Sequence, residues 1–141
     1  MAIDEGHNNF HTADGRYLHF ARLLRADGYV VKGYIGEFRK SQLKNVRLLV
    51  IANALNKINV QNWYLPTPSA FTVKETEILQ KWVKAGGSLF LVADHMPMGG
   101  AATDLAAAQY YSLARREDGV NVSSRSIPSF FFLPQHARTA L

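Results

Sequence analysis

Acidic, imidazole and amide side chains lie at or directly after the ends of three mainly apolar segments of this chain, at residues 1–4, 46–52 and 88–93. The three groups are Asp4, Glu5, His7, Asn8, Asn9 and His11; Asn53 and Asn56; and Asp94 and His95. If the apolar segments are parallel strands, their carboxyl ends meet at one edge of the sheet. Open α/β proteins bind ligands at that edge. We therefore expect a polar pocket there.

Asp94 could work with His95 or His7 as a general acid–base pair. Imidazole titrates near neutral pH, and a nearby carboxylate orients it for proton transfer. Asp94, His95 and His7 are the catalytic candidates, and the other side chains are candidates for ligand binding: Asp4, Glu5, Asn8, Asn9, His11, Asn53 and Asn56. The chain has no Gly-x-Ser-x-Gly motif that would hold a serine nucleophile.

Two other interpretations of these residues stay open. Carboxylate and imidazole groups also suit a divalent metal such as zinc, manganese or iron, with Asp4, His7, His11, Asp94 and His95 as the candidate ligands. The spacing of His7 and His11 adds little, because positions four apart share a face only on a helix. Alternatively, the Asp and Asn side chains only accept backbone N–H bonds where strands become turns.

The pattern of apolar residues predicts alternating strands and helices. Strands are expected at 1–4, 29–34, 46–52 and 88–93, and helices at 16–27, within 37–45, after Thr72 and from 101 to 108. Thr72 and Glu75 form a capping box for the third helix, and Gly86 and Gly87 end it. This order predicts an α/β fold of three layers with a mostly parallel sheet.

The last third of the chain departs from this pattern. We expect one α/β domain over residues 1–108 and a divergent tail over 109–141. The apolar block Phe130 to Leu133 lies between two prolines and could form an edge strand or a docking segment of the same domain. The long segment 53–70 carries Trp63 and Tyr64, which could form an aromatic wall for a sugar ring or simply cover the sheet edge.

Composition excludes several classes of protein. The chain has no cysteine, so disulfides, thiolate metal sites and a cysteine nucleophile are excluded. Its formal charge is +5, but the basic residues are dispersed, which argues against nucleic-acid binding. No apolar run is long enough to span a bilayer, and no signal peptide is recognisable, so we expect a cytoplasmic protein. The oligomeric state and any cofactor are not predicted.

Three segments resemble an uncharacterised bacterial family of the class I glutamine-amidotransferase-like superfamily, near the ThuA-like and DUF4350-type domains. They are residues 3–12, 49–56 and 86–95, and the similarity covers about residues 3–108. The resemblance implies a flavodoxin-like sheet with a pocket at its carboxyl edge, and a chain truncated at both ends would fit it. It implies no glutaminase activity, because Asp94, His95 and Met96 stand where the superfamily carries its cysteine nucleophile.

Two functions are therefore expected from the sequence. The first is a small-molecule-binding or hydrolase-like domain that uses the polar pocket. The second is a non-catalytic interaction or scaffold module that associates through Phe130 to Leu133.

Overall fold

The chain folds around a sheet of four parallel strands, in the order β2-β1-β3-β4. The structure is a computed structural model that describes the backbone of residues 1–114 and the side chains of residues 1–110. Its elements are β1 (Ala2–Asp4), α1 (Leu18–Ala26), β2 (Lys32–Tyr34), α2 (Lys40–Leu43), β3 (Leu48–Ala52), the 3-10 helix η1 (Lys57–Asn59), α3 (Val73–Lys84), β4 (Ser88–Val92) and α4 (Met98–Ala114).

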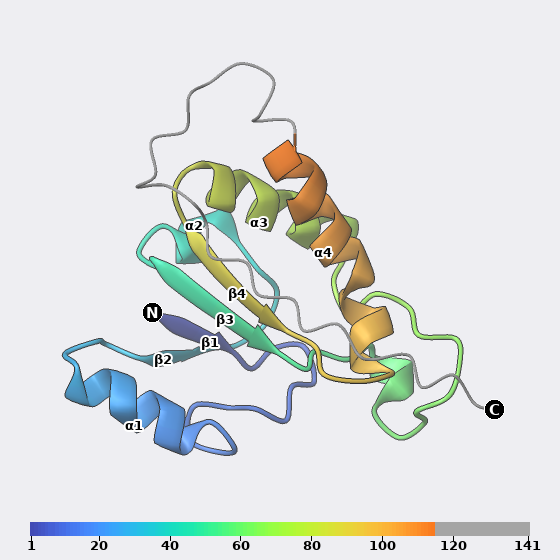
Figure 1. Ribbon diagram of the computed structural model, residues 1–141, viewed down its shortest axis with the longest axis horizontal. Coiled ribbons are helices and arrows are strands. Elements are labelled where there is room, and N and C mark those ends of the chain that lie inside the picture. Colours follow the sequence, from blue (N-terminus) through green and yellow to red (C-terminus); the bar gives the residue numbers. More distant parts are fainter. Residues whose placement is uncertain (115–141) are drawn as a thin grey trace.

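Helices cover both faces of the sheet, so the predicted three-layer α/β fold is confirmed (Figure 1). The strand order is that of flavodoxin-like sheets. In β3, Leu49 and Ile51 join the core under α3 and α4, whereas Val50 points to the other face with Ile3 and Ala21 of α1. Alternation along a strand thus assigns its residues to two cores, and both must be apolar because both faces are covered.

The predicted capping box of α3 is confirmed. Thr72 Oγ1 accepts a hydrogen bond from the Glu75 backbone N–H at 3.2 Å, and the Glu75 carboxylate accepts one from the Thr72 N–H at 2.9 Å. Leu79 and Val83 are buried against the core. The helix ends at Lys84, and Gly86, two residues later, has a φ of 102°, a left-handed conformation that favours glycine. Local sequence therefore sets both ends of α3.

Several predicted boundaries need correction. The helix predicted at 16–27 spans Leu18–Ala26, and the strands predicted from 29 and 46 begin at Lys32 and Leu48. The helix whose first part was predicted at 101–108 begins three residues earlier, at Met98, and continues to Ala114. The predicted end of the domain at residue 108 thus falls inside α4. The block Phe130 to Leu133 lies outside the described residues, so the division into domain and tail stays a prediction.

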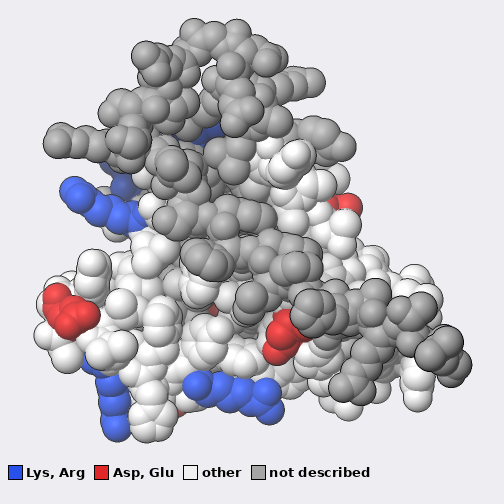
Figure 2. All heavy atoms as spheres, viewed as in Figure 1, with Lys and Arg blue, Asp and Glu red and all other residues white. Residues whose placement is uncertain are grey.

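Charged side chains are dispersed over the visible face of the molecule. Lys and Arg atoms lie at separate places, mainly along its left and lower edges, and Asp and Glu atoms lie at its left edge, near its centre and at its right (Figure 2). Within residues 1–114, no helix is long and apolar enough to cross a membrane.

Candidate functional site

The loops that follow β1 and β3 are hydrogen-bonded to each other. The Leu55 N–H donates to the His7 carbonyl at 2.8 Å, Asn8 Nδ2 donates to the Leu55 carbonyl at 2.9 Å, and Asn9 Nδ2 donates to the Ala52 carbonyl at 3.0 Å. These loops flank the point where the strand order reverses, which is the usual ligand crevice of this fold. The chain's own loops are therefore joined across this crevice, and the amides of Asn8 and Asn9 hold them together.

His7 lies buried between two carboxylates. Its Nδ1 is 2.9 Å from Asp4 Oδ1, and its Nε2 is 2.9 Å from Glu75 Oε1. Asp4 is fully buried, and His7 and Glu75 are 7% and 3% exposed. The imidazole also packs on the rings of Phe38 and Phe71, with centroids 4.7 Å and 4.9 Å away. Both ring nitrogens are thus engaged, and neither bonds to Asp94 or His95.

The pKa shifts in this cluster favour a charged His7 imidazolium beside an ionised Glu75 carboxylate. Burial acts to lower the pKa of His7, but the hydrogen bonds and charges of Asp4 and Glu75 outweigh it and raise the pKa above its ordinary value. Burial acts to raise the pKa of Glu75, but hydrogen bonds from Thr72, Phe38 and His7 hold it below its usual range. The cluster joins the end of β1 to the start of α3, and it offers a substrate no free proton acceptor on His7.

The raised pKa of His7 predicts that stability falls with rising pH. His7 binds its proton more tightly when folded, so its contribution is complete below the unfolded pKa of 6.5 and is lost as pH rises through the folded value. Urea unfolding from about pH 6 to about pH 9 should show a declining free energy of unfolding. The variant His7→Gln should lose that slope. Glu75 titrates below this window. His11 has a lowered pKa, so its unfolded pKa of 6.5 gives an opposite slope at the lower end of the window, and His7→Gln keeps that contribution. An equal slope in the variant would contradict the assignment.

A second polar group lies where β3 and β4 end, and Asn53 organises it. Asn53 is buried and has a φ of 51°, a left-handed conformation that asparagine tolerates. Its Nδ2 donates to Asp94 Oδ2 at 3.1 Å, and its Oδ1 accepts from the Asp94 backbone N–H at 3.2 Å. Asp94 Oδ1 is in turn hydrogen-bonded to His95 Nδ1. The structure therefore brings Asn53, Asp94 and His95 together, as the sequence predicted for strand ends at one edge.

Unlike His7, this pair is open to solvent. The side chains of Asp94 and His95 are 52% and 42% exposed. Burial acts to raise the pKa of Asp94, but hydrogen bonds from Asn53 and His95 hold it below its usual range, so Asp94 is an ionised acceptor at neutral pH.

Aromatic side chains lie beside Asp94 and His95. The rings of Trp63 and His95 are 5.4 Å apart at an interplanar angle of 56°. His11 contacts the edge of Tyr17 at 4.9 Å, and the charge of Asp94 acts on the pKa of both residues. Burial raises the pKa of Tyr17, and Asp94 raises it further. For His11, burial lowers the pKa, Arg16 lowers it further, and Asp94 opposes both. Trp63 thus lies beside His95, and Tyr17 and His11 lie within range of the charge of Asp94.

The other predicted ligand-binding residues make contacts within the chain. Glu5 Oε1 accepts from the Ala13 N–H at 2.8 Å, and Asn56 Nδ2 donates to the Ser69 carbonyl at 2.7 Å. His7 and His11 pack against different aromatic residues, so they do not act as a pair. Within the described residues, no group of three His, Asp or Glu side chains could hold a metal ion.

Sequence reasoning missed one member of the buried cluster. Thr72 and Glu75 predicted a capping box, but nothing in the sequence placed the other side of the Glu75 carboxylate against His7. Tyr17 lies in the segment 16–27 that was predicted as a helix, and its position beside His11 depends on the path of the 6–15 loop.

The fold and this edge define a doubly wound α/β domain. No family model and no curated protein matches this chain. A solved structure named "mmIFT52 N-terminal domain" is similar to it, with a TM-score of 0.53 and 14% sequence identity. The match covers 74% of this chain and 43% of that one, so the chain spans less than half the length of that structure. At this identity the likeness shows the fold alone.

Proposed function

We propose that this domain binds a small polyhydroxylated molecule, such as a sugar, at the carboxyl edge of β3 and β4. The observation that carries the proposal is the arrangement of Asn53, Asp94 and His95 beside Trp63. An ionised carboxylate accepts hydrogen bonds from hydroxyl groups, and an indole ring offers an apolar surface to the C–H face of a sugar. Ligand sites commonly combine aromatic walls with a few fixed polar groups.

Binding fits these contacts better than hydrolysis does. A hydrolytic reaction at this edge could not use His7 as an acid–base group beside Asp94 and His95, because both nitrogens of His7 are engaged elsewhere. The resemblance to amidotransferase-like domains supports a pocket at this edge but supplies no reaction. We therefore propose a binding domain, and not a hydrolase.

The proposal is tested by thermal melting with glucose, galactose, mannose and ribose, each at about 10 mM. A ligand that binds only the folded state raises the melting temperature, and we expect a rise of about 2 °C or more for at least one sugar. Asp94→Asn should keep the fold and lose this rise. Asp104→Asn, an exposed substitution on α4, should keep the rise.

Trp63→Phe gives a second measurement, because sugar binding over Trp63 should change its fluorescence. The wild-type fluorescence should change with the sugar that stabilises the protein, and the variant should lose most of that change. If none of the four sugars shifts the melting temperature, or if Asp94→Asn keeps the shift, the proposal is wrong.

A further inference from the structure

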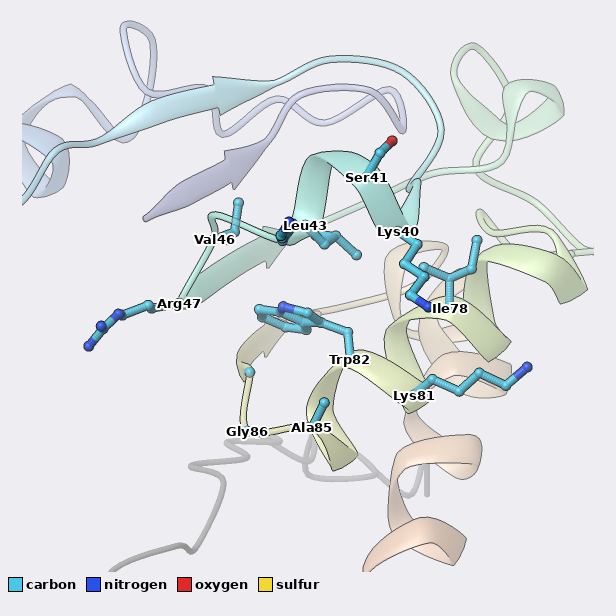
Figure 3. A pocket seen from close by; sticks show the side chains of 12 residues that line it. Lys40, Ser41, Leu43, Val46, Arg47, Ile78, Lys81, Trp82, Ala85 and Gly86 are labelled. Carbon is cyan, nitrogen blue, oxygen red and sulfur yellow. The ribbon is translucent and has the colours of Figure 1, made fainter.

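A cavity of about 950 Å³ opens at the opposite edge of the sheet, between α2 and α3. Arg47 precedes β3 and Gly87 precedes β4, so the cavity lies at the amino ends of these strands, away from Asp94 and His95. Figure 3 shows Trp82 at its centre, with side chains from α2 above it and from α3 beside it. We call this cavity the α2–α3 groove.

The floor of the α2–α3 groove is apolar. It is formed by Leu43, Val46, Ile78 and Trp82, which also pack on the main core. A Cβ added to Gly87 would come within 2.2 Å of the Trp82 ring, so the indole lies directly on the Gly87 backbone. Glycine at this position lets the indole lie against the chain and keeps the floor flat.

The rim of the groove is basic. Lys40, Lys44, Arg47 and Lys81 line it, all four are exposed, and none of the lining residues is acidic. Lys81 forms a loose pair with exposed Glu77, at 3.8 Å. In the part of the chain that the structure describes, the other three have no acidic partner within 4.0 Å. In Figure 3 Arg47 and Lys81 extend to opposite sides of the indole, which spreads the positive charge around an apolar centre.

Charge and polarity restrict what can occupy the groove. A purely polar polyanion would make no apolar contact with the floor, so it matches the groove poorly. A small molecule with one carboxylate would pair with one of the four basic side chains and leave the other three without a partner in the ligand. The segment 115–141 of this chain contains four arginines and two acidic residues, so its charge does not complement the rim. An occupant with several carboxylates and at least one apolar side chain matches both the rim and the floor.

We propose that the α2–α3 groove binds an acidic, amphipathic segment of a partner protein, with an apolar side chain of that segment over Trp82. The carboxylates of the segment pair with Lys40, Lys44 and Arg47. The net charge of +5 adds a long-range attraction that speeds the encounter at low salt. This surface is separate from the sugar site, and either proposal can fail without the other.

The test uses the full chain and a fluorescein-labelled peptide of roughly 12 residues that repeats Glu-Glu-Leu-Leu. Fluorescence polarisation should show saturable binding that weakens when salt rises from about 50 mM to about 300 mM. Lys40→Glu combined with Lys44→Glu should raise the Kd roughly tenfold or more. The matched control combines Lys32→Glu with Lys57→Glu, which makes the same charge change outside the groove and should leave the Kd within about twofold.

A peptide of the same length that contains only glutamate tests the apolar floor, and it should bind roughly tenfold more weakly. Melting curves establish that all variants are folded, since the four lysines are exposed. The proposal is overturned if the alternating peptide does not bind, if both lysine pairs have equal effects, or if the all-glutamate peptide binds as well. It is also overturned if a single-stranded oligonucleotide or phosphatidylserine vesicles bind more tightly and displace the peptide.

Discussion

Replacing Glu75 by alanine should lower the free energy of unfolding by about 3–5 kcal/mol. The Glu75 carboxylate accepts hydrogen bonds from the backbone N–H and the hydroxyl of Thr72, from the Phe38 N–H at 2.9 Å, and from His7. Its removal leaves the Phe38 N–H and the Nε2 side of the buried His7 imidazolium without this acceptor, which costs more than the loss of an exposed pair. Urea unfolding followed by circular dichroism measures this loss.

Glu77→Ala is the matched control, because Glu77 lies on the same helix and its ion pair among the described residues is with exposed Lys81. It should change stability by less than about 1 kcal/mol. Glu75→Gln should lower the free energy of unfolding by an intermediate amount. Its amide oxygen can still accept a hydrogen bond from the Thr72 N–H, but the negative charge beside His7 is gone. If Glu75→Ala and Glu77→Ala are equally stable, the buried cluster does not join β1 to α3 as described.

Gly6→Ala should destabilise the protein by about 1–3 kcal/mol. A Cβ on Gly6 would lie 2.5 Å from the Gly36 carbonyl oxygen and 2.6 Å from the Gly36 nitrogen. Both contacts are with backbone, so no side chain can move to relieve them. The loops after β1 and β2 would have to separate, next to the hydrogen bond from the Glu5 N–H to the Tyr34 carbonyl at 2.8 Å.

Gly99→Ala provides the comparison for Gly6→Ala. A Cβ on Gly99 would meet only Met96 Sδ at 3.6 Å, an ordinary contact, and Gly99 lies in α4, where alanine is the better residue. This variant should be as stable as the wild type or more stable by up to about 1 kcal/mol. Thermal melting of both variants, in parallel, tests the contrast. If Gly6→Ala has the same melting temperature as the wild type, the loops after β1 and β2 are not in close contact at Gly6 and Gly36.

The elements of the fold could be predicted because their signals are local. The buried run at 46–52, the capping box at Thr72 and Glu75, and the glycines at 86 and 87 each depend on neighbouring residues. Boundaries were less accurate because the pairing of the strands decides them. Tyr29, Val30 and Val31 have strand-like side chains, but β2 begins at Lys32, where its pairing with Ala2 begins.

The candidate site could be predicted only in part. Parallel strands correctly implied that Asn53, Asp94 and His95 meet at one edge. The sequence could not show that His7 turns toward Glu75, because that contact joins residues far apart along the chain through a side chain assigned to helix capping. The α2–α3 groove was not predicted either, since its lining comes from two segments far apart in the sequence, 40–47 and 78–87, whose basic residues look dispersed.

The parallel pairing of the strands has a consequence for the rate of folding. The paired residues nearest in sequence are those of β1 and β2, such as Ala2 and Lys32, and β3 pairs with β4 from Leu48 and Ser88 onward. No two of these strands are joined by a tight turn, so each pairing must close a long stretch of chain before it contributes any hydrogen bonds. Chains with mainly non-local contacts fold slowly. We therefore expect refolding to be slow for a chain of this length. During synthesis, the central strand β1 is made first, and both strands that pair with it, β2 and β3, are made later.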